Sequence, residues 1–300
     1  MSSTQYLQLA ALFIGCSLLE YLLGRAQKFK ATSGDKMLDI VGFALLAAVS
    51  QPAVFWIVSK IGLAVAPAYQ GVLTGIPWWA AISLFLVGDD MLQYWWHRMS
   101  HSRLLWPLHR AHHTAHYMSA RIIYRNNFFY YAAMPAIWVS GLLVYMGLTK
   151  VYLVYIVIKL AVITGAHSSV RWDEPLYRIK ALKPLMWLVQ RTISTPATHF
   201  AHHAMTNRDG IGFYKGNFGN LLFFWDVLFG TAHITQQYPA QVGLRDDELF
   251  GKEKWWIELF YPVFRSSRVH SALVPGGLPY DDGSETPNGS GQQQTPQGAG

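Results

Sequence analysis

The chain has 300 residues, of which 52% are hydrophobic and only 14% are charged, and its formal net charge is +7. Soluble domains carry about 25% charged residues, so this composition indicates a membrane protein. The basic residues form no stripe on a polar domain, and we expect them to face anionic lipid and not nucleic acid. The single cysteine, Cys16, excludes an intramolecular disulfide and a cysteine-based zinc site.

Apolar segments along the chain predict about four or five membrane-spanning helices. In chain order these segments are 6–24, 38–58, 78–96, 128–146 and 151–166. The first has no basic n-region or cleavage site and is expected to be a retained helix. Pro52 predicts a kink in the second, and a turn beginning at Gly147 predicts that the last two form a helical hairpin. The stretch 61–75 contains Pro67 and Gly71 and predicts a re-entrant or interfacial piece.

The distribution of lysine and arginine predicts how these spans are oriented. The basic loop after the first span, residues 25–36, is expected in the cytoplasm, with the N-terminus outside. The third span then ends in the cytoplasm at His97, and the hairpin returns the chain to the same side at His167. Every histidine cluster is thus predicted to lie on the cytoplasmic side.

Eight of the twelve histidines fall into three clusters, and their spacing is that of one helix face. The clusters are His97 with His101, then His109 with His112 and His113, and finally His199 with His202 and His203. Neutral imidazole is a common ligand for iron, zinc, copper and nickel. Eight such ligands exceed what one ion can use, which favours two metal ions. Solvated histidine runs are the alternative, but two clusters repeat the same H-x-x-H-H spacing.

Four further residues lie close in sequence to the clusters or at the end of a predicted span. His167 ends the last span on the side of the clusters and is a candidate ninth ligand. His116 follows His113 by one helical turn and is a possible ligand or supporting group. Asp90 lies two turns before His97 and is predicted to accept a hydrogen bond from a ligand imidazole, which fixes the tautomer of that ring. Asp89 points elsewhere.

Two histidines and several motifs are set aside. His233 and His270 have no partner at helical spacing and are predicted not to be ligands. The chain has no G-x-G-x-x-G fingerprint, no P-loop and no H-E-x-x-H. Any redox work therefore needs electrons from a separate partner. The segment around Trp225 and Asp226 is predicted either to dock over the metal site or to lie at the membrane interface.

The three histidine clusters resemble those of the fatty acid hydroxylase/sterol desaturase superfamily of integral-membrane di-iron enzymes. The approach Asp90-x3-Tyr94-Trp95-x-His97 and the closing stretch 216–226 are similar to that family as well. The resemblance implies that the eight clustered histidines ligate two irons and that His167 completes the set. It also implies an all-α transmembrane bundle, with O2 as co-substrate and a ferredoxin-, cytochrome b5- or reductase-type electron donor.

The leading hypothesis is an O2-dependent lipid hydroxylase or desaturase whose substrate is a sterol, an acyl chain or another apolar lipid. A membrane zinc hydrolase is an alternative, but no carboxylate base lies inside the histidine motifs. A haem-binding electron carrier would need histidines that face each other from separate spans, whereas these clusters lie at the ends of spans. Ionisable residues at mid-span would favour a metal store or transporter, but the predicted spans have few of them.

Together these observations predict an all-α integral-membrane bundle with a cytoplasmic helical cap that carries a histidine-rich di-metal site. The predicted division has three parts: N-terminal transmembrane helices at 1–77, a catalytic domain at 78–274 and a disordered tail at 275–300.

Overall fold

We describe the chain from a computed structural model. The structure describes residues 31–268 and 271–274, together with positions 11, 14, 15, 18, 20, 22 and 277. The predicted span at 6–24 therefore lies largely outside the described residues. So do His270 and nearly all of the predicted tail. The division into three parts stays a prediction.

The described chain is helical, as predicted, and contains no strand; a single antiparallel bridge joins Ala204 to Val242. The α-helices are α2 (Ser33–Ala44), α3 (Gln51–Val65), α4 (Trp78–Phe85), α5 (Leu92–Ser100), α6 (Trp106–His113), α7 (Phe128–Ala133), α8 (Pro135–Leu143), α9 (Thr149–His167), α10 (Asp173–Tyr177), α11 (Lys183–Thr192), α12 (Pro196–His202), α13 (Phe224–Leu228), α14 (Arg245–Phe250) and α15 (Trp255–Phe260). Short π-helical or 3-10 pieces connect some of them: η2 (Leu45–Ser50), η3 (Pro67–Tyr69), η4 (Leu86–Met91), η5 (Ala120–Tyr124), η6 (Val144–Leu148) and η7 (Lys180–Leu182).

Two helical stretches, Ser33–Val65 and Pro135–His167, are long and apolar enough to cross a membrane. The first begins at a capping box formed by Thr32 and Asp35 and continues through η2 and α3, so a π-helical turn precedes Pro52. Gly147 divides the second stretch, because its φ of 108° is not helical. A Cβ at Gly147 would lie 2.4 Å from Thr74 Oγ1, so only glycine fits this turn. The predicted hairpin is confirmed.

One predicted span is interrupted, and another ends later than predicted because α3 continues to Val65 instead of ending at 58. The segment predicted to span from 128 to 146 is interrupted at Met134, because Pro135 begins a new helix there and α7 ends one residue earlier. The stretch 61–75 holds the end of α3, then η3 and a loop. That loop packs on the hairpin turn, where Gly71 N–H donates to the Tyr145 carbonyl.

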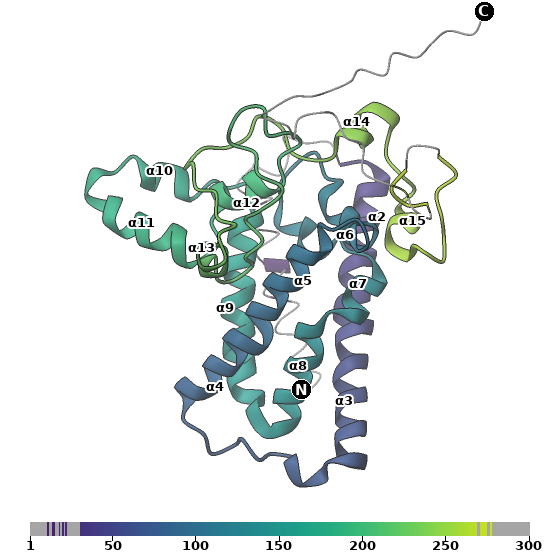
Figure 1. Cartoon of the computed structure of the whole chain (residues 1–300), viewed down its shortest axis with the longest axis vertical. Helices are drawn as coiled ribbons and strands as arrows, with labels where there is room; N and C mark the ends of the chain where they lie inside the picture. Colours follow the sequence, from purple (N-terminus) through teal and green to yellow (C-terminus); the bar gives the residue numbers. More distant parts are fainter. Residues whose placement is uncertain are drawn as a thin grey trace, which may run out of the picture.

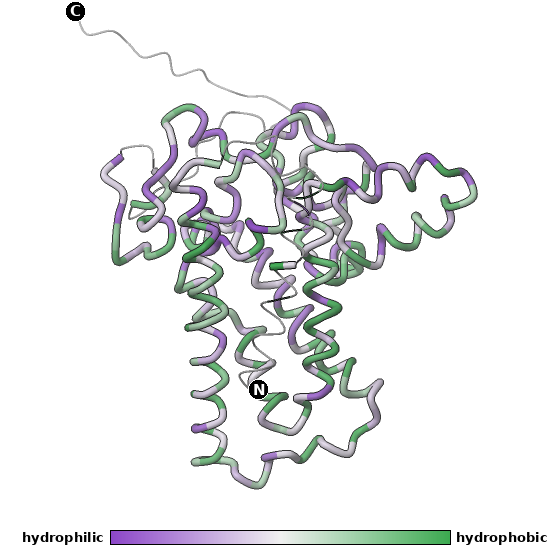
Figure 2. Tube along the Cα trace, turned by 180° about the vertical axis from the view of Figure 1, so that it is seen from behind, coloured by the Kyte–Doolittle hydropathy of each residue, from purple (hydrophilic) through white to green (hydrophobic). Residues whose placement is uncertain are grey.

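The molecule has a stem of long helices and a cap at one end of them (Figure 1). The stem comprises residues 33–100 and 135–167, and the cap comprises 106–133 and 168–268. Phe55, Phe85 and Tyr152 form part of the core where α3, α4, α8 and α9 pack together. The stem is rich in hydrophobic residues, and most of the strongly hydrophilic ones are in the cap (Figure 2). The helices α5, α6, α9 and α12 therefore each have one end at the boundary between stem and cap.

Two buried arginines hold the cap together. Arg110 on α6 pairs with Asp246, Asp247 and Glu258, which come from α14 and α15. Burial raises the pKa of Glu258 to about 8, and Arg110 acts against this rise. Arg125 pairs with Asp35 and Asp39 of α2. These ion pairs fix one end of the histidine-bearing segment 109–125 against α14 and α15 and the other end against α2 of the stem.

Substitution of Arg110 by methionine is expected to destabilise the cap strongly. It would leave three carboxylates buried without their cation, and breaking such a pair lowers the free energy of unfolding by about 3–5 kcal/mol. Arg245→Met is the matched control, because the Arg245–Glu248 pair is exposed and is worth about 1 kcal/mol or less. Thermal unfolding followed by tryptophan fluorescence measures both, and equal melting temperatures for the two variants would contradict the assignment.

Candidate metal centre

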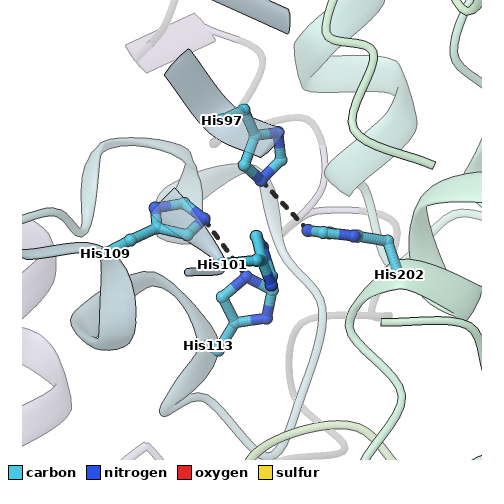
Figure 3. Close-up of side chains that lie close together, drawn as sticks. All are labelled: His97, His101, His109, His113 and His202. Carbon is cyan, nitrogen blue, oxygen red and sulfur yellow. Dashed lines mark hydrogen bonds between the residues drawn. The ribbon is translucent and has the colours of Figure 1, made fainter. Parts of the chain in front are cut away.

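Nine histidines converge where the stem meets the cap, and they form two groups. The first group is His97, His101, His109, His113 and His202, and the second is His112, His167, His199 and His203. Within each group the nearest ring nitrogens all lie within 4.8 Å of one another. The side chains of the first group point toward a common centre (Figure 3). The structure thus brings together all nine predicted ligands, from α5, α6, α9 and α12.

The two H-x-x-H-H motifs divide between the groups in opposite ways. On α6, His109 and His113 belong to the first group, whereas His112 belongs to the second. On α12, His199 belongs to the second group and His202 to the first, and His203, the C-cap of that helix, belongs to the second. Residues four apart share a helix face and adjacent residues do not, so each helix contributes to both groups. Pro196 and the Thr195 capping box begin α12 just before its first histidine.

Hydrogen bonds at Nδ1 fix the orientation of five of the rings. His97 donates to the Phe218 carbonyl at 2.7 Å, and His202 donates to the Gly216 carbonyl at 2.7 Å. His112 and His167 contact the carbonyls of Ile122 and Ile163 at 3.2 and 2.9 Å. A carbonyl only accepts, so Nδ1 of these four rings carries the proton. The fifth, His109, contacts Asn126 Oδ1 at 2.8 Å.

Because Nδ1 is the protonated nitrogen, Nε2 of these rings carries a lone pair that faces the centre. Nε2 of His97 is 3.0 Å from Nε2 of His202, and Nε2 of His112 is 3.3 Å from Nε2 of His167. Two lone pairs at such distances repel each other unless a cation lies between them. One such pair occurs in each group, so the donor set of both groups fits a metal ion.

Burial keeps the rings neutral, which is the form that binds metal. Removal from water lowers the pKa of His112, His113 and His203 well below the usual value, and neighbouring imidazoles lower it further. Nε2 of His101 is buried and has no hydrogen-bond partner in the described structure. The two groups contain neither cysteine nor carboxylate, and an all-imidazole set suits iron, zinc, copper or nickel.

Asp90 was predicted to accept a hydrogen bond from a ligand imidazole, and this prediction is wrong because its partners are other groups. Its carboxylate accepts from the N–H groups of Leu221 and Leu222 and from Trp225 Nε1. Backbone carbonyls take the predicted role, because they bond the ring nitrogens directly. Asp90 instead holds the loop 216–222, which carries two of those carbonyls.

The segment around Trp225 and Asp226 docks against the same loop. Asp226 accepts from the N–H groups of Phe218 and Gly219 at 2.8 and 2.6 Å, and from the Thr231 hydroxyl. Burial raises the pKa of Asp226 to about 6, and these hydrogen bonds limit the rise. Both Trp225 and Asp226 are buried, so of the two predicted roles the structure favours docking over the site.

The remaining candidate histidines lie apart from both groups. His116 is half-buried and lines a separate cavity of about 460 Å³, together with Arg171 and Glu174. His233 contacts the Gly210 carbonyl on an exposed loop. Neither belongs to the two groups, so the structure shows no contact between His116 or His233 and the centre.

Sequence reasoning missed Asn126. Its Oδ1 accepts from His109, and its Nδ2 donates to the Tyr131 hydroxyl at 3.2 Å. Asn126 is buried and follows its histidine by 17 residues on another element. No spacing rule connects the two positions, so nothing in the sequence signals the contact.

A largely apolar cavity of about 690 Å³ reaches the metal centre from the stem. Its lining includes His97, His109, His112 and His167, so it borders both histidine groups. Apolar side chains such as Leu46, Ile137 and Ile163 form much of the remaining wall. Its volume lies within the range of cavities that bind drug-sized molecules.

Loss of one histidine from either group is expected to remove one metal ion. His113→Ala affects the first group and His203→Ala the second, so metal content is predicted to fall from about two ions per chain to about one in each variant. His116→Ala is the control, because this nearby histidine lies outside both groups. Elemental analysis of the purified protein measures the ratio. Full metal content in both group variants would contradict the assignment.

Asn126→Leu is expected to weaken metal binding without removing a ligand. The change frees the His109 ring to rotate, and loss of such a supporting contact lowers metal affinity by about 10–100-fold. Chelator competition measures that affinity. Tyr131→Phe is the control, because it removes the other partner of Asn126 and leaves the bond to His109 in place.

Comparison with known proteins agrees with this arrangement. The family model described as fatty acid hydroxylase matches residues 82–231, which is half of the chain. Human alkylglycerol monooxygenase is 31% identical over 171 residues, covering 53% of this chain and 32% of the relative. The Xenopus tropicalis and Danio rerio proteins of the same name are 26% and 28% identical over 156 residues, covering 51% of this chain and 30% of each relative.

The chain thus matches about a third of the length of these curated relatives. No solved structure matches it. The matched range contains both H-x-x-H-H motifs, the loop 216–222 and the residues that support it. The chain belongs to the fatty acid hydroxylase family.

Proposed function

We propose that this chain is a membrane di-iron oxygenase that uses O2 to hydroxylate or desaturate a lipid. The observation that carries the proposal is the junction of two all-imidazole groups with one largely apolar cavity. The family and the alkylglycerol monooxygenase relatives support a lipid oxygenase in general. The identity of the metal, the lipid and the use of O2 belong to the proposal.

Iron fits the donor set and the setting better than zinc does. A zinc hydrolase needs a carboxylate general base beside the metal, and neither histidine group in the described residues includes a carboxylate. When bound, two irons would supply the redox chemistry that an unactivated C–H bond requires, with electrons from an external donor. No side chain of this centre could remove such a hydrogen by acid–base chemistry alone.

The protein residues orient the ligands and exclude water. The carbonyls of Gly216 and Phe218 hold two rings with Nε2 inward, and Asp90 and Asp226 hold the loop that carries those carbonyls. Tyr130 and Tyr131 are buried in the cavity wall beside His109. A lipid chain in the cavity would therefore meet the centre away from bulk water.

The membrane placement completes the proposal. The two long apolar helical stretches and the family support a membrane protein. We place the stem in the bilayer and the cap on its cytoplasmic side, because the loops near the centre are rich in arginine and lysine. The lipid would enter from the membrane and the electron donor would approach the cap.

The proposal predicts about two irons per chain in protein purified from iron-replete membranes. With a reductant and ¹⁸O2, hydroxylation would add one ¹⁸O atom to a membrane lipid, whereas desaturation would remove two hydrogens without adding oxygen. Mass spectrometry of the extracted lipids distinguishes the two. His109→Ala is expected to lower the iron content to about one ion per chain and to abolish product, and His116→Ala to keep both the iron and the product. Zinc without any O2-dependent product after iron reconstitution would overturn the proposal.

A further inference from the structure

The cavity beside the metal centre has a second, polar region within the stem. Polar side chains line it there, among them Gln51, Asp89, Ser140, Tyr152 and Lys159. They come from four different elements, α3, η4, α8 and α9. Ionisable side chains inside a membrane-spanning region are costly, and they usually face a cavity with a function.

Asp89 is already saturated by donors. It forms an ion pair with Lys159, and it accepts from the Ser140 hydroxyl at 2.5 Å and the Tyr155 hydroxyl at 2.9 Å. The carboxylate is 5% exposed and has no need of a ligand.

Lys159 is not saturated. An ammonium group has three N–H donors, and Asp89 is its one recorded hydrogen-bond acceptor among the described residues. Its Nζ also lies 5.5 Å from the centroid of the Tyr155 ring. Lys159 is 5% exposed and lines the cavity, so a ligand in that space is within reach of the donors that Asp89 does not use. The complementary group on a ligand is an oxygen that accepts a hydrogen bond.

The polar region lies at a defined distance from the histidines. Asp89 precedes His97 by eight residues on one continuous helix, and Lys159 precedes His167 by eight residues on α9. Eight α-helical residues rise about 12 Å, which is the backbone separation along α9, and the stretch from Asp89 to His97 has a similar length although its first turn is π-helical. An extended chain advances about 3.4 Å over three covalent bonds, so about ten bonds would span this distance.

We propose that Lys159, held by Asp89, anchors an amphiphilic lipid by an acceptor oxygen, either a carboxylate or a hydroxyl, about ten bonds from the carbon that reaches the metal centre. This inference rests on the proposed function for its reaction but not for its binding site. It assigns Lys159 as a residue that determines which position along the lipid reaches the metal centre.

Binding is measured first, without turnover. Tritiated hexadecanoic acid, 1-hexadecanol and hexadecane are titrated onto the full-length purified protein in detergent, in the absence of reductant. The acid, the alcohol or both are expected to bind about tenfold more tightly than the hydrocarbon, the effect of one hydrogen bond to a charged group. The pattern tells whether a carboxylate is required or a hydroxyl suffices. Equal affinity for all three probes would overturn the proposal.

Lys159→Met is expected to abolish this preference. Lys150→Met is the matched control, because Lys150 is an exposed residue at the far end of the same helix. Lys159→Met alone leaves Asp89 buried without its cation, so a second variant combines it with Asp89→Leu and removes both charges. A preference for acid or alcohol that persists in the folded double variant contradicts the anchor.

The position of oxidation separates this inference from the proposed function. With reductant and O2, the bound probe is expected to be oxidised about ten bonds from its oxygen, and the Lys159 variants to give a mixture of positions. If the probe binds selectively through Lys159 but no oxidised product forms, the anchor proposal stands and the oxygenase proposal is overturned. Oxidised lipid whose binding and position of oxidation do not depend on Lys159 would support the oxygenase and overturn the anchor.

Discussion

The candidate metal centre depends on the hydrogen bonds that fix the protonated nitrogen of its imidazoles. Four carbonyls hold Nδ1–H groups, so the lone pairs of Nε2 are forced together at about 3 Å. That arrangement is unfavourable without a cation. Burial adds to the effect by keeping the rings uncharged. The fold of the cap, the docked loop and the buried arginines all serve to maintain this arrangement of unprotonated nitrogens.

The sequence was sufficient to predict the helical class, the hairpin at Gly147 and the convergence of the nine histidines. These features depend on local rules: apolar length, a glycine-specific turn and helical spacing. The division of each H-x-x-H-H motif between two groups also follows from helical geometry, once both helices are known to meet. This division could not be predicted, because a single sequence does not show how α6 and α12 face each other.

The failed expectations concern contacts between distant segments. Asp90 bonds a loop more than 130 residues away, and Asn126 reaches His109 from another element. Backbone carbonyls act as acceptors, and no residue type marks a carbonyl in a sequence. The break before Pro135 shows a further limit: an apolar composition continued through 128–146, but the restriction that proline imposes on Met134 ended the helix. Local composition alone does not place such boundaries.

The use of main-chain oxygens at the centre has a consequence for how this family can diversify. A carbonyl is present whatever side chain its residue carries, so substitutions at Phe218, Ile122 or Ile163 leave the acceptor itself intact. Ligand orientation is therefore encoded in the path of the backbone, whereas the cavity wall is encoded in side chains. The two can vary almost independently, so a single substitution can reshape the cavity while the orientation of the imidazoles stays unchanged.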